Sequence, residues 1–195
     1  MARTDTPYEL PKGLPLPTDD GATDHLPGIL LPSVALTSTR GSRVDLASRG
    51  GRTVVYCYPR SGQPDVDPPK GWDQIPGARG CTPQSCGFRD SYGDLHALGI
   101  EVFGLSTQTT DYQLEAVRRL KLPFDLLSDS ELIFTHALKL PTFEIESMTL
   151  VKRLTLIILD GRIEKVFYPV FPPDKNAAEV IEWLLQNRAG QPLKR

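Results

Sequence analysis

The apolar and polar positions along this chain follow two periods, a period of two that is typical of strands and a period near 3.6 that is typical of helices. Strands are predicted at residues 53–58, 100–106, 124–127, 152–159 and 162–168, and a hairpin at 33–47 turns at Arg40-Gly41-Ser42. Helices are predicted at residues 81–98, 110–120, 128–138 and 174–188. Strands that alternate with helices and end in an antiparallel hairpin predict an α/β fold, in which helices flank a mixed central sheet.

Capping residues mark the expected helix starts. Thr82 is a favourable N-cap and Pro83 suits the first helical position, so the first helix is expected to begin directly after Cys81. Capping boxes predict the starts of two further helices at Thr110–Gln113 and Ser128–Glu131.

Two segments lack this periodicity. Residues 1–27 are rich in Pro, Gly, Asp and Thr, and we interpret them as an extended N-terminal arm. Residues 60–80 carry four prolines and form a long irregular loop, which is uncommon inside a compact domain and is often functional. We therefore divide the chain into an arm, 1–27, and one domain, 28–195, with an insertion loop at 60–80.

Composition narrows the class of function. The formal net charge of −2 predicts no broad basic face for nucleic acid. No apolar run is long enough to span a bilayer, and the first residues lack the apolar core of a secretory signal, so a cytoplasmic location without membrane contact is expected. The three cysteines, an odd number, argue against a secreted disulfide framework and favour catalytic, redox or metal-binding thiols.

Two of these cysteines, Cys81 and Cys86, fall at the first predicted helix start. Unpaired backbone N–H groups and the positive end of the helix dipole gather there and favour an anion. We therefore expect a nucleophilic Cys81 thiolate with Cys86 as its resolving partner. The alternative is that both are small core residues. Cys57 lies inside a predicted strand and is expected to be buried and inert.

The spacing of the pair sets a geometric condition. Residues five positions apart on a helix are separated by about 500° of rotation and about 7.5 Å of rise, so their side chains lie on different faces. A disulfide needs Cα atoms within about 7 Å. A bond between Cys81 and Cys86 therefore requires the first helical turn to unwind or shift, and the reduced and oxidised forms should differ in structure.

Metal and cofactor sites are not expected. The C-x4-C spacing and the scattered His25, His96 and His136 differ from the short paired spacings of structural zinc sites, so metal binding is the weaker alternative. The sequence contains neither a thioredoxin-type C-x-x-C motif nor a Gly-rich phosphate motif, and no flavin or nucleotide is expected.

The segment Gly80-Cys81-Thr82 with Cys86-Gly87-Phe88-Arg89-Asp90 resembles the G-C-T-x-x-x-C-x-F-R-D signature of the peroxiredoxins, in their Q-type or bacterioferritin-comigratory branch. Further segments are similar to family motifs in the same order, at residues 55–59, 102–106, 124–129 and 153–158. The resemblance extends from about Leu26 to Arg188, and the order and spacing of the pieces make it specific. It implies a thioredoxin-like fold.

Carried onto this sequence, the resemblance implies a role for each site residue. Cys81 would be the peroxidatic cysteine, Cys86 the resolving cysteine, Arg153 the arginine that holds thiolate and peroxide, and Pro59 the proline that shields the pocket. The implied activity is reduction of hydrogen peroxide or organic hydroperoxides through a sulfenic acid and an intramolecular disulfide. Thioredoxin or a similar dithiol protein is the implied reductant. Members of this branch are commonly monomeric, and a dimer is the alternative.

Two features depart from the family pattern. The family has Thr or Ser three residues before the peroxidatic cysteine, where this chain has Ala78, and the insertion loop is extra. Ser61 and Thr82 are candidates for the missing hydroxyl, while Arg79 is either a new cation beside the thiol or an ordinary solvated charge. These departures leave two alternatives, a peroxide sensor or a thiol–disulfide exchange protein on the same fold.

Overall fold

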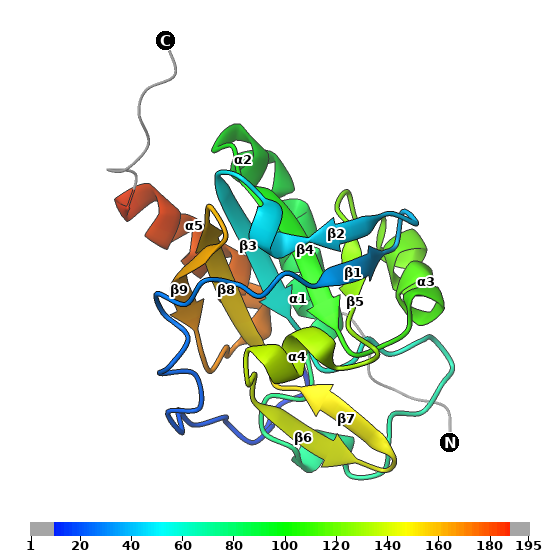
Figure 1. Cartoon of the computed structure of the whole chain (residues 1–195). Helices are drawn as coiled ribbons and strands as arrows, with labels where there is room; N and C mark the ends of the chain where they lie inside the picture. Colours follow the sequence, from blue (N-terminus) through cyan, green and yellow to red (C-terminus); the bar gives the residue numbers. More distant parts are fainter. Residues whose placement is uncertain (1–9, 188–195) are drawn as a thin grey trace.

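A seven-stranded mixed sheet forms the centre of the computed structural model, which describes residues 10–187 (Figure 1). The strand order is β2-β1-β5-β4-β3-β8-β9, in which β3, β4 and β5 run parallel and the outer strands pair antiparallel. The strands are β1 (Ala35–Ser38), β2 (Arg43–Asp45), β3 (Arg52–Cys57), β4 (Glu101–Ser106), β5 (Leu126–Ser128), β8 (Leu154–Leu159) and β9 (Arg162–Phe167). The predicted mixed α/β fold and its N-terminal hairpin are confirmed.

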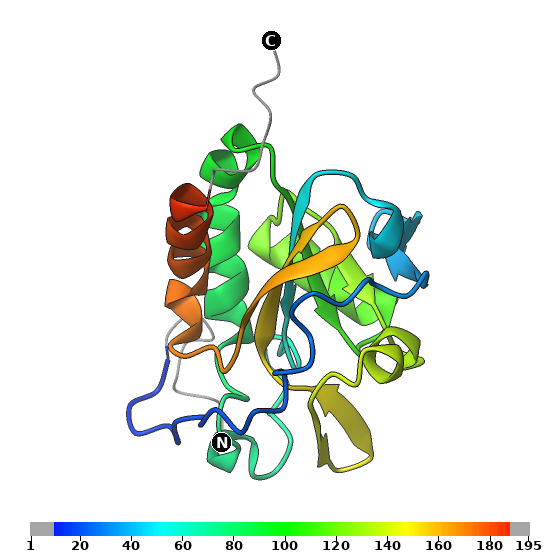
Figure 2. The ribbon, with the colours of Figure 1, turned by 60° about the vertical axis from the view of Figure 1, so that its left-hand side comes forward.

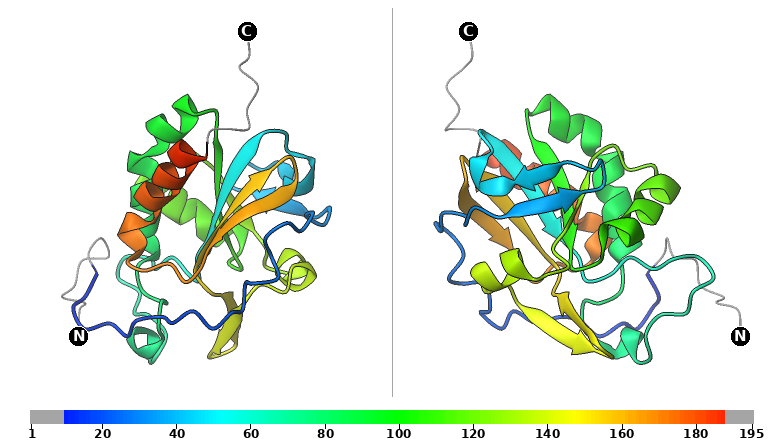
Figure 3. Two further views of the ribbon diagram at one scale, coloured as in Figure 1. Left: turned by 90° about the vertical axis from the view of Figure 1, so that its left-hand side faces the viewer. Right: turned by 45° about the vertical axis from the view of Figure 1, so that its right-hand side comes forward.

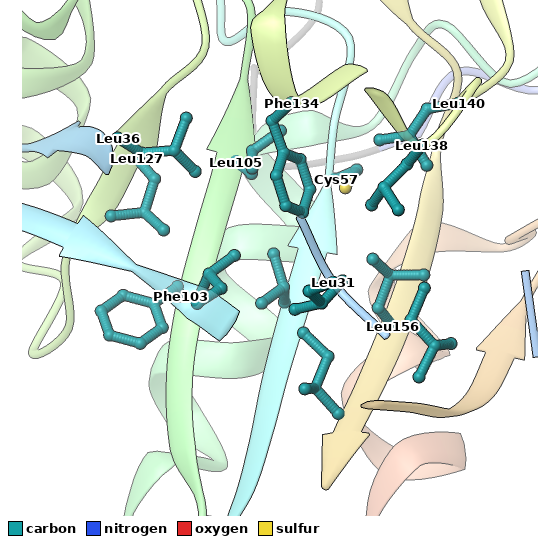
Figure 4. Packing of buried hydrophobic residues seen from close by; sticks show 14 of the residues in the cluster. Leu31, Leu36, Cys57, Phe103, Leu105, Leu127, Phe134, Leu138, Leu140 and Leu156 are labelled. Atoms are coloured by element: carbon teal, nitrogen blue, oxygen red, sulfur yellow. The ribbon is translucent and has the colours of Figure 1, made fainter. Parts of the chain in front are cut away.

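Alternate residues of β3 enter two separate hydrophobic clusters, because successive side chains of a strand point to opposite faces. Val54 and Tyr56 join one cluster, whereas Val55 and Cys57 join the other. Figure 4 shows Cys57 within the second cluster, together with Phe134. Cys57 is fully buried, as predicted, and faces away from the cluster that contains Cys81.

Helices cover both faces of the sheet. The face with Tyr56 packs against α1 (Cys81–Asp90), α2 (Tyr92–Ala97), α3 (Thr110–Leu120) and α5 (Asn176–Gln186), and Figure 2 shows α1 and α5 side by side. Helix α4 (Ile133–Ala137) covers the other face. Short 3₁₀ helices are η1 (Leu46–Ser48), η2 (Trp72–Gln74) and η3 (Pro173–Lys175). Helix α1 is anchored to the sheet where Phe88 stacks on Tyr56, with ring centroids 4.5 Å apart.

The first helix differs from its prediction at both ends. It begins at Cys81, with Gly80 as its N-cap at a φ of 103°, so the prediction of Thr82 as N-cap is wrong. Glycine alone adopts this φ at little cost, and its presence moves the helix start two residues earlier. The predicted helix 81–98 is also interrupted at Ser91, which separates α1 from α2 and places His96 on α2.

Neither predicted capping box forms. Helix α3 has Thr109 as N-cap without a side-chain hydrogen bond, and the amide of Gln113 turns into the core, where it donates to the Leu127 carbonyl at 2.8 Å. The N–H groups of Phe134 and Thr135 in α4 donate instead to the Asp129 carboxylate, at 3.0 and 2.8 Å. Gln113 and the N–H groups of α4 therefore bond to partners other than the residues that the capping boxes predict.

The sequence pattern missed a second, two-stranded sheet, formed by β6 (Thr142–Ile145) and β7 (Met148–Val151). Ile145 and Leu150 from this hairpin pack with Trp72 and Ala78 of the insertion loop in a small apolar cluster. Figure 3 shows the hairpin and the loop together below the main sheet. The strands are short, and apart from Val151 their buried residues pack against a loop instead of the main core, so neither predicted period marks them clearly.

The ends of the described chain bear on two predictions. The last helix, α5, ends at Gln186, and its predicted end at residue 188 lies outside the described residues, as do residues 1–9 of the predicted arm. Residues 10–27 form no helix or strand, and Asp20 accepts from Lys152 Nζ at 2.8 Å. No helix between residues 10 and 187 has the length and apolar character needed to cross a bilayer.

We predict that Gly80→Ala lowers the free energy of unfolding by about 2–3 kcal/mol, because alanine is strained at this φ and its Cβ would collide with Pro173. Gly41→Ala is the matched control, since Gly41 has a φ of 80° with open space around it. The control should cost about 1 kcal/mol. Urea unfolding measures both, and equal losses would contradict the close approach to Pro173.

Candidate active site

Cys81 is the first residue of α1 and lies in a buried position, with 4% of its surface exposed. Its sulfur accepts a hydrogen bond from Arg153 Nη2 at 3.2 Å and lies 3.7 Å from the carbonyl oxygen of Ala78. The first-turn N–H groups of a helix lack intrahelical partners and favour negative charge. A cation and a helix N-terminus therefore converge on one sulfur, an arrangement that stabilises a thiolate.

Arg153 precedes β8 and is buried, with 3% exposure. Its guanidinium donates to three consecutive backbone carbonyls of the loop before α1, from Nε to Gly77 at 3.2 Å and from Nη2 to Ala78 and Arg79 at 3.1 Å each. Nη1 donates to the side-chain oxygen of Gln84. These bonds fix the plane of the guanidinium, so its Nη2 group is held beside the sulfur.

Gln84 is a site residue that the sequence reasoning did not single out. It lies on α1 one turn after Cys81, is fully buried, and joins Arg153 to Asn176, whose Oδ1 accepts from Gln84 Nε2 at 2.9 Å. Its helical spacing from Cys81 was a usable signal, because side chains three apart share a helix face. Asn176 offered no such signal, since it lies 92 positions from Gln84.

A cleft opens beside Cys81, and the insertion loop forms much of its wall. Loop residues that line it include Val66, Pro68, Pro69 and Trp72. Arg60 lies at the same cleft and donates to the Tyr112 hydroxyl at 2.9 Å, with its guanidinium carbon 4.8 Å from the centre of the Tyr112 ring. The wall of the cleft that reaches Cys81 therefore combines apolar loop residues with the cationic Arg60.

The candidates for the missing hydroxyl have different surroundings. Thr82 lines the cleft with Cys81. The Ser61 hydroxyl is not at the cleft surface; it donates to Gln108 Oε1 at 3.0 Å in a buried position. Ala78, which replaces the family hydroxyl residue, lines the cleft and is fully buried, with its side chain in the apolar cluster of Trp72.

Arg79 and Pro59 hold less direct positions. The Arg79 guanidinium forms a bidentate ion pair with Asp73, with Nη2 and Oδ2 2.9 Å apart, so a carboxylate offsets the charge that we considered for the thiol. Its backbone carbonyl instead serves Arg153. Pro59 is buried, two residues after the end of β3, and is not among the residues that line the cleft, so its shielding role stays a prediction.

Cys86 is half-buried, on the same regular helix as Cys81, and both thiols are free. Burial raises the pKa of Cys86, and the nearby Arg89 opposes this shift only in part. Burial also raises the pKa of Cys57 strongly, which keeps that thiol protonated. Within residues 10–187, no group of three or more His, Cys, Asp or Glu side chains could hold a metal ion.

Comparisons with known proteins decide the family. A family model described as Redoxin matches residues 26–181. The chain belongs to the Redoxin family. Peroxiredoxin Q from Sedum lineare is 31% identical over 155 residues, which cover 78% of this chain and 74% of that protein. Peroxiredoxin Bcp from Escherichia coli K12 is 28% identical over 165 residues, or 82% of this chain and 96% of that protein. The chain is therefore a peroxiredoxin of the Q and Bcp branch, as its motifs predicted.

Solved structures support the fold of this peroxiredoxin. Peroxidoxin BcpB from Mycobacterium tuberculosis has a TM-score of 0.68 and 22% identity over 85% of this chain and 100% of its own. PrxQ from Xylella fastidiosa, in a mutant form, also has a TM-score of 0.68, with 19% identity over 84% and 98% of the chains. The predicted thioredoxin-like fold is confirmed. Against the longer chloroplastic peroxiredoxin Q of Oryza sativa subsp. japonica, at 31% identity, the chain covers 65% of the relative's length.

We predict that Cys86 reacts as a high-pKa thiol. In a Cys81→Ser variant, the rise of its alkylation rate by iodoacetamide should lie at higher pH in the folded protein than in urea, where the same cysteine follows the ordinary pKa of about 8.5. Arg89→Ala should move the profile to still higher pH, because Arg89 lowers the pKa of Cys86. Mass spectrometry of the alkylated peptide measures the rate. A folded-state profile at the same pH as the profile in urea, or at lower pH, would contradict this assignment.

Proposed function

We propose that this chain is a thiol-dependent peroxidase that reduces a hydroperoxide at Cys81 and recycles through a Cys81–Cys86 disulfide. The observation that carries the proposal is the 3.2 Å contact between the Arg153 guanidinium and the Cys81 sulfur at the N-terminus of α1. Membership of the peroxiredoxins supports it. The apolar wall of the cleft is compatible with organic hydroperoxides as well as hydrogen peroxide.

In the first step, the Cys81 thiolate attacks the terminal oxygen of the hydroperoxide. An S–O bond forms while the O–O bond breaks, and the departing alkoxide or hydroxide takes up a proton to leave as alcohol or water. Arg153 and the first-turn N–H groups of α1 stabilise the negative charge on the sulfur and on the departing oxygen. Thr82 is our candidate for the hydroxyl that orients the peroxide, because it lines the cleft beside the sulfur.

In the second step, the Cys86 thiol loses its proton and its sulfur attacks the sulfur of the Cys81 sulfenic acid. The S–O bond breaks as the disulfide forms, and the departing hydroxide takes up a proton to leave as water. Both cysteines belong to one regular helix in the reduced structure, so α1 has to unwind locally before the sulfurs can meet. A dithiol protein of the thioredoxin type then supplies two electrons and two protons to restore both thiols.

The disulfide mechanism predicts defined masses. One equivalent of hydrogen peroxide should lower the mass of the reduced protein by about 2 Da, the loss of two hydrogens. A Cys86→Ser variant should instead gain about 16 Da, the mass of one oxygen. Intact-mass spectrometry measures both, and Cys81→Ser should show neither change.

Two outcomes of a turnover assay with peroxide, thioredoxin and its reductase would contradict parts of the proposal. Peroxide consumption by Cys81→Ser at the wild-type rate would remove Cys81 as the nucleophile. Rapid oxidation of the wild type, without recovery of the thiols by thioredoxin and its reductase, would favour a peroxide sensor over a peroxidase.

We predict that Arg153→Lys slows Cys81 oxidation about 100-fold, because lysine keeps the charge but loses the planar fork that reaches the sulfur and the loop carbonyls together. Arg52→Lys is the matched control, since Arg52 is similarly buried and pairs with Glu164 away from the cleft. Stopped-flow oxidation gives the rate, and circular dichroism checks that each variant is folded. Equal rates for the two variants would exclude a specific role for Arg153.

A further inference from the structure

A buried chain of hydrogen bonds continues behind Arg153, away from the cleft. Gln84 receives Arg153 Nη1 on its side-chain oxygen and donates through Nε2 to Asn176 Oδ1 at 2.9 Å. The Thr155 hydroxyl donates to the same Asn176 oxygen at 2.7 Å. Gln84, Asn176 and Thr155 are all fully buried. These hydrogen bonds therefore connect α1, α5 and β8 to the arginine that contacts the sulfur.

Only one order of donors and acceptors along these hydrogen bonds is compatible with the arginine. A guanidinium carries donors and no acceptor, so Gln84 has to present its oxygen to Arg153 and its NH₂ group to Asn176. Asn176 must then present its oxygen to Gln84. The Thr155 hydroxyl, as a second donor to that oxygen, holds the Asn176 amide in this orientation.

Strand geometry explains why Thr155 can reach this chain. Thr155 and Ile157 are two positions apart on β8, and residues with this spacing point to the same face of a sheet. That face is covered by α1 and α5, which supply Gln84 and Asn176. The Thr155 hydroxyl therefore projects from β8 into the helix layer that holds Asn176, and Arg153, directly before the strand, reaches Gln84 in the same layer.

The amide of Asn176 also carries a cost in stability. Its Nδ2 is buried and has no hydrogen-bond partner among the described residues. An unsatisfied buried donor is unfavourable, and an apolar side chain of similar size would avoid the penalty. The Asn176 amide supplies the oxygen that accepts the hydrogen bond from Gln84. An apolar residue at this position would lose that bond.

We propose that Asn176, held by Thr155, is a positioning residue that orients Gln84 and thereby directs the Arg153 guanidinium at Cys81. The effect on peroxide reduction rests on the proposed function. The effect on Arg153 does not, because the order of its guanidinium is measurable without any substrate.

The test compares two Thr→Val substitutions in neighbouring strands. Thr155→Val removes the hydroxyl that holds Asn176 and preserves the branched shape of the side chain. Thr53→Val on β3 is the matched control, because Thr53 is equally buried and its hydroxyl has no hydrogen-bond partner among the described residues. Thr155→Ser restores the hydroxyl and serves as the rescue. Asn176→Leu removes the acceptor itself.

Hydrogen exchange of the Arg153 guanidinium, followed by NMR of the reduced protein, is the first readout. The loss of one supporting hydrogen bond should accelerate exchange about tenfold in Thr155→Val and at least as much in Asn176→Leu. Thr155→Ser and Thr53→Val should remain close to the wild type. Wild-type exchange in Thr155→Val would overturn the proposal, even if Asn176→Leu failed to fold.

The rate of Cys81 oxidation by hydrogen peroxide is the second readout, and it should fall about tenfold in Thr155→Val. Faster guanidinium exchange with an unchanged oxidation rate would also overturn the proposal, because Arg153 would then be loosened without consequence at Cys81. If peroxide did not oxidise the wild type, the proposed peroxidase function would fail, while faster exchange in Thr155→Val alone would still support the positioning of Arg153.

Discussion

The contact between the Arg153 guanidinium and the Cys81 sulfur is the interaction on which the architecture of the site depends. Both groups are almost completely buried, and a buried charge is costly unless it is paired and its remaining donors are satisfied. The carbonyl oxygens of Gly77, Ala78 and Arg79 accept from the guanidinium, so the loop before α1 has to curl around the arginine. That same curl delivers Cys81 to the start of the helix. One set of hydrogen bonds therefore satisfies the cation and places the nucleophile.

Helix α1 has to hold Cys81 in place in the reduced protein, and its first turn has to unwind for the proposed disulfide to form. Its N-terminus lies against η3, where Gly80 leaves no room for a Cβ, and Gly87 approaches the Asp174 backbone so closely that a Cβ would lie 3.1 Å from the carbonyl oxygen. Gln84, between the two cysteines, ties the first turn to Arg153 and Asn176. These contacts would break when the turn unwinds to form the proposed disulfide. The contacts that stabilise the reduced helix are therefore the same contacts that oppose formation of the disulfide.

The insertion loop is part of the domain's packing as well as a wall of the cleft. Trp72 and Ala78 pack with the β6–β7 hairpin in an apolar cluster of their own, next to the carbonyls that hold Arg153. This packing explains what the small side chain of Ala78 does here, because it fills space within an apolar cluster. Ser61 is hydrogen-bonded to Gln108 away from the cleft, so Thr82 remains of the two candidate hydroxyls.

The sequence by itself determined the features that depend on local pattern. Alternation and helical spacing predicted the strands of the main sheet, the N-terminal hairpin and the burial of Cys57, and the spaced motifs identified the family and singled out Cys81 and Arg153. Only the tertiary structure decided which of several partners each polar side chain takes. Asp129 displaced a local capping box, Asp73 engaged Arg79, and Asn176 met Gln84 across 92 positions. The physical reason is that a buried donor or acceptor must find a partner wherever packing brings one, and that partner is set by three-dimensional proximity instead of sequence distance.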